Sequence, residues 1–199
     1  MAESIKIEIF RKKLPDDLTK SLAETDSRTD IGSGAALSAA AAAAYFTRAA
    51  ALTAEYGESS ERLSYMQRNG EILRSYMVNL IDEDVKCRGP LRKAQKEGEE
   101  YKIEAAMQTA AAIANEIINM MNQMLSLLEE LSHLAAPEAK HFVTASADLA
   151  MGAIRACMRY VLDLSEKNSD DTYRYIVKRE NEITLETCRE NYAKIVDSI

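Results

Sequence analysis

The sequence contains no tryptophan, and only three prolines and seven glycines interrupt its 199 residues. Alanine, glutamate, leucine, methionine and lysine are abundant instead, and this balance favours helix over sheet almost everywhere. The chain is 47% hydrophobic, which is enough to bury one good core. We therefore expect an all-α protein that forms a single domain over residues 1–199.

Cysteine is also scarce. Cys87, Cys157 and Cys188 are odd in number, lie far apart and fall within helical patterns. These features argue against a disulfide scaffold, and no charged and apolar leader precedes them. We expect reduced thiols and a cytoplasmic protein.

The chain has no clustered basic surface and no long, strongly apolar run. Its net charge is -7 and its pI is about 5.1, which argues against nucleic acid as a partner because phosphates are neutralised by clustered cations. The uncharged run over residues 31–47 is about as long as a membrane span, but alanine dominates it and gains little from lipid. We expect a buried central helix there and no membrane association.

Standard enzyme signatures are absent. The sequence has no glycine-rich phosphate loop followed by Lys-Ser or Lys-Thr, no His-Glu-x-x-His, no Cys-x-x-Cys and no Gly-x-Ser-x-Gly. Its two histidines, His133 and His141, flank a helix break at Pro137, and the nearby glutamates do not repeat the Glu-x-x-His pattern of carboxylate-bridged metal sites. We expect histidines at helix ends and no bound metal.

Apolar residues recur at helical spacing along most of the chain, which predicts an antiparallel bundle of about six helices. An amphipathic stretch begins at Ile5, and Pro15 followed by two aspartates restarts it as a helix. The glycine and proline at positions 89 and 90 are expected to break the third helix. The expected elements are residues 15–23, 35–56, from 59–61 to about 86, a short segment at 91–97, 99–134, a helix starting at 136–138, and a terminal helix after a turn at 167–171.

The most informative stretch is a small-residue entry to an alanine helix. Asp30, Gly32, Ser33 and Gly34 are expected in a loop that leads directly into this helix, which carries Ser38 in its first turns. Backbone covered only by hydrogen atoms and methyl groups can be approached closely by another helix or by a ligand. Backbone N–H groups at such a helix start can also hold a carbonyl or carboxylate. These five residues are our candidate ligand-binding set.

Asp82 and Asp84 are the best candidates for acid–base chemistry. They are expected near the end of the third helix, where the helix dipole disfavours negative charge unless a cation or a ligand compensates for it. The alternative is a solvated helix end, in which Lys86 and Arg88 balance the acids. Residues two apart lie about 200° around a helix from each other, so only one aspartate is expected to face a cleft. Asp82 is favoured because it borders the buried stripe and lies further from the expected helix end.

The order of these motifs resembles the formiminotetrahydrofolate cyclodeaminase and methenyltetrahydrofolate cyclohydrolase family. The resemblance rests on residues 30–38 opening the alanine helix and on Leu80-Ile81-Asp82-Glu83-Asp84 near the end of the next one. It extends to Phe10 with Leu14 and to Ala153-Ile154-Arg155-Ala156, where the family has Ala-Leu-Arg-Gly. It covers nearly the whole chain.

The resemblance implies a fold and an activity. Members of this family are all-α homodimers that act on the one-carbon unit carried between N5 and N10 of tetrahydrofolate. A tetrahydrofolate derivative would then be the substrate, and Asp82 and Asp84 would be the carboxylates available for proton transfer or for binding the pterin edge. The reaction would be cyclodeaminase or cyclohydrolase chemistry.

Several departures from the family pattern support a second interpretation. The family loop Pro-Thr-Pro-Gly-Gly-Gly-Ser becomes Arg28-Thr29-Asp30-Ile31-Gly32-Ser33-Gly34, and its lysine cluster after the alanine helix becomes Ala54-Glu55-Tyr56-Gly57-Glu58. Its Ser-Asp-Ala-Gly before the fifth helix falls on His141-Phe142-Val143-Thr144, so that aspartate is missing. The alternative is a non-catalytic paralogue that binds a small molecule or a helical partner.

The fourth expected helix predicts self-association. Its 35 or so residues would span about 50 Å, which exceeds a compact domain of this size. It carries Met107, Met120, Met121 and Met124, which we interpret as apolar surface that a second subunit covers. We expect a homodimer.

Overall fold

The computed structural model describes residues 15–25, 29–57 and 59–199, and over these residues the protein is all-α. The amphipathic stretch predicted from Ile5 lies outside the described residues. The helices are α1 (Pro15–Ala23), α2 (Ile31–Tyr56), α3 (Glu61–Glu97), α4 (Glu100–Leu134), α5 (Lys140–Glu166) and α6 (Asp171–Asp197). The predicted fold class and the order of the six helices are confirmed.

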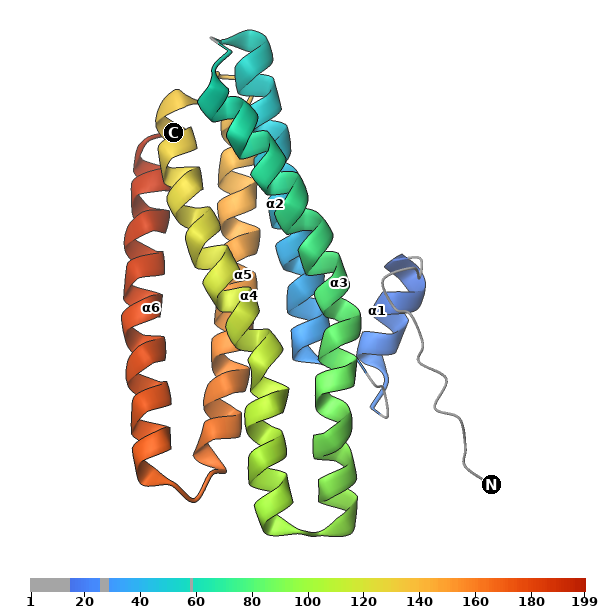
Figure 1. Ribbon diagram of the computed structural model, residues 1–199. Coiled ribbons are helices and arrows are strands. Elements are labelled where there is room, and N and C mark those ends of the chain that lie inside the picture. Colours follow the sequence, from blue (N-terminus) through green and yellow to red (C-terminus); the bar gives the residue numbers. More distant parts are fainter. Residues whose placement is uncertain (1–14, 26–28, 58) are drawn as a thin grey trace.

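Helices α2 to α6 run up and down in one elongated bundle, and α1 lies outside it, beside α3 and the start of α2 (Figure 1). Helix α2 begins part-way along the bundle, so the last turns of α3 and the first turns of α4 extend beyond it. This offset leaves the start of α2 flanked by the C-terminal half of α3.

The alanine helix starts earlier than predicted. Gly32, Ser33 and Gly34 belong to the first turn of α2 and not to a loop. Asp30 is the N-cap residue, and its carboxylate accepts a hydrogen bond of 2.7 Å from the Ile31 N–H. An aspartate is favoured at this position because it satisfies a free N–H group and complements the positive end of the helix dipole.

Helix α3 is continuous to Glu97, so the predicted break at Gly89 and Pro90 is wrong. A proline inside a helix removes one N–H donor, but the following residues Leu91 and Ala94 are buried in the bundle and hold the helix in place. The predicted stop at Gly98 is correct, because this residue has the left-handed conformation (φ 73°) typical of a helix end. Asp82 and Asp84 therefore lie in mid-helix.

The fifth helix, in contrast to α2, starts later than predicted. Residues 137–139 form a turn in which the Ala139 N–H donates to the Ala136 carbonyl at 2.8 Å, and α5 begins at Lys140. Pro137 therefore precedes the helix instead of occupying its first position. The turn before α6 lies where it was predicted, and Asp170 caps that helix through the N–H groups of Thr172 and Tyr173.

Close packing around the alanine helix is the main feature of the core. Helix α2 lies between α3 and α5, and the Ser146 hydroxyl of α5 donates to the Ala42 carbonyl at 2.7 Å. On the α3 side, a Cβ atom at Gly70 would lie 2.3 Å from the Thr47 hydroxyl oxygen. Helix α2 is long and apolar enough to span a membrane, but half of its most apolar window is buried in the bundle. We interpret it as a core helix.

Replacement of Ala43 by leucine should destabilise the protein, because Ala43 is fully buried and the helices around it leave little room. Overpacking of this kind costs about 1–3 kcal/mol. Ala41 lies on the exposed side of the same helix turn, so Ala41→Leu is the matched control and should be nearly neutral. Thermal unfolding of both variants tests this, and equal melting temperatures would show that α2 is not tightly packed.

The three cysteines are free thiols in the described structure. Cys157 is fully buried, and burial raises the pKa of its thiol to about 12. Such a thiol is unreactive at neutral pH because the thiolate is the nucleophilic form. The cytoplasmic location inferred from the cysteines stays a prediction.

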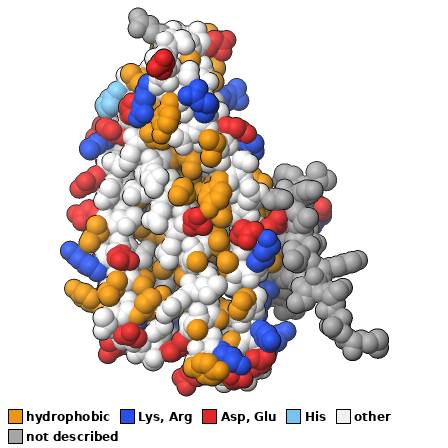
Figure 2. All heavy atoms as spheres, viewed as in Figure 1, with side chains coloured by type: hydrophobic (Ala, Val, Ile, Leu, Met, Phe, Trp, Pro, Cys, Tyr) orange, Lys and Arg blue, Asp and Glu red, His pale blue; other side chains and the backbone are white. Residues whose placement is uncertain are grey.

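The argument for a homodimer needs correction, although the dimer itself stays a prediction. Met107, Met121 and Met124 are buried in the core of their own chain and do not form a free apolar face. The exposed apolar residues lie elsewhere, and Figure 2 shows hydrophobic side chains gathered over α3, which carries exposed Tyr65 and Ile72. Analytical ultracentrifugation at micromolar concentration should show a dimer, and a single 22.1 kDa species would contradict it.

Candidate functional site

A pocket of about 1020 Å³ lies between α1, the start of α2, the C-terminal half of α3 and the middle of α5. In Figure 1 this is the region where α1 faces the lower end of α2. The volume is at the upper end of the range for small-molecule sites. Its lining residues are Leu22, Glu24, Thr25, Thr29, Asp30, Ile31, Gly34, Ala35, Ser38, Arg88, Arg92, Gln95, Lys96, Gly152, Ala153 and Ala156.

Three of the five predicted ligand-binding residues line this pocket. Asp30 forms an ion pair with Arg88 across the gap between α2 and α3. Gly34 has only Leu22 near the position of a Cβ atom, so it presents open backbone to the pocket. The Ser38 hydroxyl donates to the Leu149 carbonyl of α5 at 3.2 Å, which fixes α2 against the opposite wall.

The other two, Gly32 and Ser33, do not line the pocket but contact Asp84 behind the pocket wall. The expectation that N–H groups of this turn are free for a ligand is wrong for two of them. The Ser33 N–H donates to Asp84 Oδ2 at 2.9 Å, and the Gly34 N–H donates to the Asp30 carbonyl at 3.0 Å. These two N–H groups of the first turn of α2 are therefore satisfied within the protein.

Asp84 is the most enclosed acid of the site. It is 0% exposed, and its Oδ2 also accepts a hydrogen bond of 2.8 Å from the Ser33 hydroxyl. Its other oxygen, Oδ1, has no hydrogen-bond partner. Burial raises the pKa of this carboxyl, and the two hydrogen bonds from Ser33 together with the charge of Arg92 oppose the rise.

Gly32 is required by the position of this carboxyl. A Cβ atom at Gly32 would lie 2.1 Å from Asp84 Oδ1, well inside the contact distance of two atoms. Gly32 does not have a positive φ, so the reason is space and not backbone conformation. The small-residue entry that the sequence singles out is thus the place where α3 presses a carboxyl against the start of α2.

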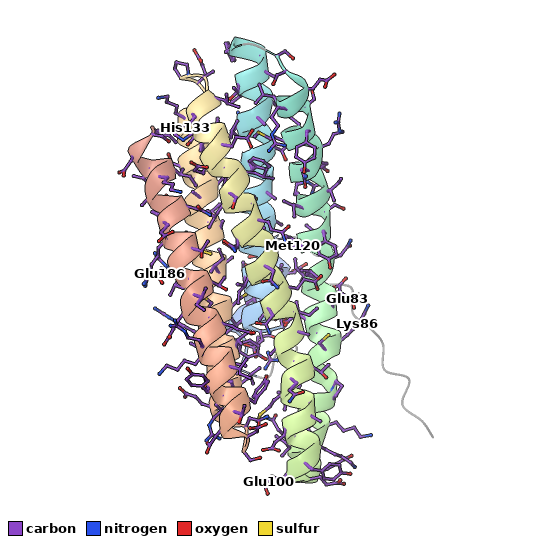
Figure 3. All side chains as sticks on the ribbon, turned by 60° about the vertical axis from the view of Figure 1, so that its left-hand side comes forward. Glu83, Lys86, Glu100, Met120, His133 and Glu186 are labelled. Atoms are coloured by element: carbon purple, nitrogen blue, oxygen red, sulfur yellow. The ribbon has the colours of Figure 1, made fainter. Side chains whose placement is uncertain are left out.

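The three consecutive acidic residues Asp82, Glu83 and Asp84 lie in three different environments. Asp82 is buried at 6% exposure and is not among the pocket-lining residues. Glu83 and Lys86 point away from the bundle and form an ion pair of 2.6 Å on the outer face of α3 (Figure 3). The solvated interpretation therefore holds for Glu83. One of the two reasons for preferring Asp82, its greater distance from the helix end, is wrong, because α3 does not end near Asp84.

The pocket also contains a basic face that the sequence analysis missed. Arg88, Arg92 and Lys96 follow one another at intervals of four along α3, and all three line the pocket. Residues at this spacing share one side of a helix. The signal was present in the sequence, but the expected break at Gly89 and Pro90 separated Arg88 from the other two.

The sequence profile described as formiminotransferase-cyclodeaminase matches residues 16–182, which is most of the chain. The chain belongs to this family. The crystal structure of formiminotetrahydrofolate cyclodeaminase from Thermotoga maritima is similar, with a TM-score of 0.86 over 94% of this chain and 96% of that one. The two sequences are 19% identical, so this likeness shows the fold. A search of curated proteins found no match.

Helix α1 from its second residue, helices α2 to α5 and the first turns of α6 lie within the family match, and so do all the pocket-lining residues. No group of three or more potential metal ligands occurs within the described part of this cyclodeaminase-family chain. His133 lies at the C-terminal end of α4, with its Nε2 atom 3.4 Å from Glu129 Oε1 (Figure 3). His141 lies at the start of α5, and its ring is tilted by 41° against the ring of Phe142. Neither histidine lines the pocket.

Proposed function

We propose that this protein acts in one-carbon metabolism on a tetrahydrofolate derivative bound in the pocket beside Asp84. The observation that carries the proposal is the combination of a large pocket at the start of α2 with a buried carboxyl of raised pKa behind its wall. The family membership supports the folate part of the proposal. The proposed ligand-binding residues that touch the pocket are Asp30, Gly34 and Ser38.

The basic face of α3 suits the acidic end of such a ligand. Arg92 and Lys96 lie on the last turns of α3 and line the pocket, and Lys96 is exposed. Cations at this position would bind the carboxylates of a glutamate tail, and they would take the place of the lysine cluster that the sequence lacks.

Two reactions fit this site. In cyclodeaminase chemistry, N10 attacks the formimino carbon on N5, N10 loses its proton, and the former imino nitrogen gains protons and leaves as ammonia. In cyclohydrolase chemistry, water adds to the methenyl carbon and one carbon–nitrogen bond opens. Both reactions move a proton to or from nitrogen, so both need a positioned acid or base.

We assign this proton-transfer role to Asp84 in preference to Asp82. The carboxyl lies behind the pocket wall, so this role requires part of the wall at the start of α2 to move and let the substrate reach it. Its Oδ1 atom is free of hydrogen bonds, and a pKa raised by burial brings a carboxyl closer to the pH at which it can both take up and release a proton. Ser33 holds the other oxygen, so it orients the carboxyl. Asp82 has no part in proton transfer in this proposal.

Turnover assays test the proposal directly. The purified protein should release ammonia from 5-formiminotetrahydrofolate or hydrolyse 5,10-methenyltetrahydrofolate faster than the uncatalysed reaction. The substrate that is turned over decides between cyclodeaminase and cyclohydrolase. Absence of both activities from a folded protein that still binds tetrahydrofolate would overturn the catalytic part of the proposal.

One observation favours the alternative of a non-catalytic paralogue. Asp84 is fully enclosed and its hydrogen-bond partner Ser33 does not line the pocket, so the carboxyl can serve as an anchor for α2 without touching a ligand. A paralogue of this kind would bind a small molecule in the pocket and leave it unchanged. Binding of tetrahydrofolate without turnover would support this alternative.

A further inference from the structure

Unsatisfied polar atoms are concentrated behind the pocket. Among the described residues, the buried side-chain nitrogen and oxygen atoms without a hydrogen-bond partner belong to Asp84, Arg88 and Tyr160. Buried polar groups are almost always hydrogen-bonded, because an unmet donor or acceptor costs free energy. Their concentration in one place indicates that a group from outside the protein completes the set.

Arg88 connects this cluster to the pocket. It lines the pocket, its side chain is only 14% exposed, and its guanidinium forms an ion pair with Asp30 on one side. On the other side it lies over the ring of Tyr160, with 5.4 Å between the guanidinium carbon and the ring centroid. The Nε–H group remains without an acceptor although the guanidinium is fixed on both sides.

Tyr160 lies one helical turn beyond Ala156, which lines the pocket from α5. The tyrosine is 6% exposed and its hydroxyl has no partner. Residues four apart share a helix face, so the tyrosine continues the pocket wall inward toward Arg88. A hydroxyl and a guanidinium N–H together offer two donors to one acceptor.

We propose that Arg88 and Tyr160 form a recognition pair that binds one oxygen acceptor of the ligand, a carbonyl or a carboxylate. Arg88 Nε–H and the Tyr160 hydroxyl donate to this oxygen when the pocket is filled. The inference rests on the proposed function for the identity of the ligand, but not for the existence of the pair. It makes these two residues determinants of specificity that act at the inner end of the pocket.

The empty protein provides the first test. Tyr160→Phe removes only the unpartnered hydroxyl, so its melting temperature should equal or exceed that of the parent. Tyr192→Phe is the matched control, because the Tyr192 hydroxyl donates to Asp148 at 2.5 Å and its loss should not be stabilising. A larger drop in melting temperature for Tyr160→Phe than for Tyr192→Phe would overturn the proposal, because the hydroxyl would then have a partner in the empty protein.

Binding provides the second test, with tetrahydrofolate as the probe. Tyr160→Phe and Arg88→Lys should each weaken binding by about fivefold or more, since each loses one hydrogen bond to the ligand. Arg88→Lys keeps the positive charge opposite Asp30 and removes Nε–H. Tyr192→Phe should bind as the parent does. Parent-like affinity of both pocket variants would overturn the proposal.

Two fragments distinguish the sources of the oxygen. A tetrahydropterin without the tail supplies a ring carbonyl, and p-aminobenzoylglutamate supplies carboxylates. The fragment whose binding is weakened by Tyr160→Phe carries the recognised group. If the parent binds tetrahydrofolate and neither fragment loses affinity in the variant, the pair is not a recognition pair. If the parent binds no folate, the proposed function fails. The comparison of melting temperatures alone then decides whether the Tyr160 hydroxyl lacks a partner, as the proposal requires.

Discussion

Asp84→Asn is expected to lower turnover of the folate substrate by about tenfold or more, which corresponds to about 1.4 kcal/mol, while the helical fold stays intact. Asparagine has nearly the same shape as aspartate and can still accept a hydrogen bond from Ser33. Its amide cannot take up or release a proton near neutral pH. Steady-state kinetics with circular dichroism as a fold check measures both parts of the prediction.

Asp82→Asn is the matched control for this substitution. It removes a buried carboxylate from the same helix, two residues away from Asp84. We expect turnover close to that of the parent. If Asp84→Asn keeps full activity while Asp82→Asn loses it, the assignment of the working carboxyl is reversed. If neither substitution changes activity, neither aspartate is catalytic.

The same variant tests the electrostatics of the site. Because burial raises the pKa of Asp84, its carboxyl favours the folded state at pH values below the unfolded pKa of about 3.9, and this contribution is lost as pH rises through the higher folded pKa. The unfolding free energy of the parent minus that of Asp84→Asn should therefore fall with rising pH across this window. Urea unfolding at several pH values measures this difference. A difference that rises with pH would mean that the folded pKa is lowered.

Gly32→Ala is expected to destabilise the protein by about 1–3 kcal/mol or more, because the new methyl group would lie 2.1 Å from Asp84 Oδ1. Relief of this clash requires α3 and the start of α2 to separate or the carboxyl to leave Ser33. Either change weakens or breaks the hydrogen bonds that Ser33 donates to the buried carboxyl. For a chain of this size, each kcal/mol lowers the melting temperature by about 2–4 °C.

Gly34→Ala is the control two residues along the same helix turn. A Cβ atom at Gly34 would meet only Leu22, at ordinary contact distances of 3.6 and 3.7 Å. Because alanine favours helix over glycine by about 0.5–1 kcal/mol, this variant should be neutral or slightly stabilised. A Gly32→Ala protein that melts like Gly34→Ala would show that Asp84 does not press against the start of α2.

The fold was predictable from sequence because helical spacing is a local signal. The helical spacing of α4, the start of α3 near residues 59–61 and the stop at Gly98 depend on nearby residues, and all are correct. The break predicted at Pro90 is wrong because tertiary contacts keep the helix continuous past the proline. The burial of Leu91 beyond the proline compensates for one missing backbone hydrogen bond, and no local pattern shows this burial.

The site was predictable in part for the same reason. The glycine and serine entry to α2 and the aspartates of α3 were recognised, but the choice between Asp82 and Asp84 depended on where α3 ends. The pairing of Asp84 with Ser33 joins residues far apart in sequence, which no spacing rule reveals. Arg88 was assigned to charge compensation on its own helix, whereas the structure pairs it with Asp30 of α2.

Isothermal titration calorimetry with tetrahydrofolate tests the central claim that this pocket binds a reduced folate. Gly152 lines the pocket and Gly89 does not, and both are exposed helix positions with open space around a new Cβ atom. Gly152→Leu should therefore fill the pocket without disturbing the fold, and Gly89→Leu is its control. We predict saturable binding to the parent and to Gly89→Leu, and none to Gly152→Leu. No binding to the parent at millimolar ligand, or equal binding to all three proteins, would contradict this account.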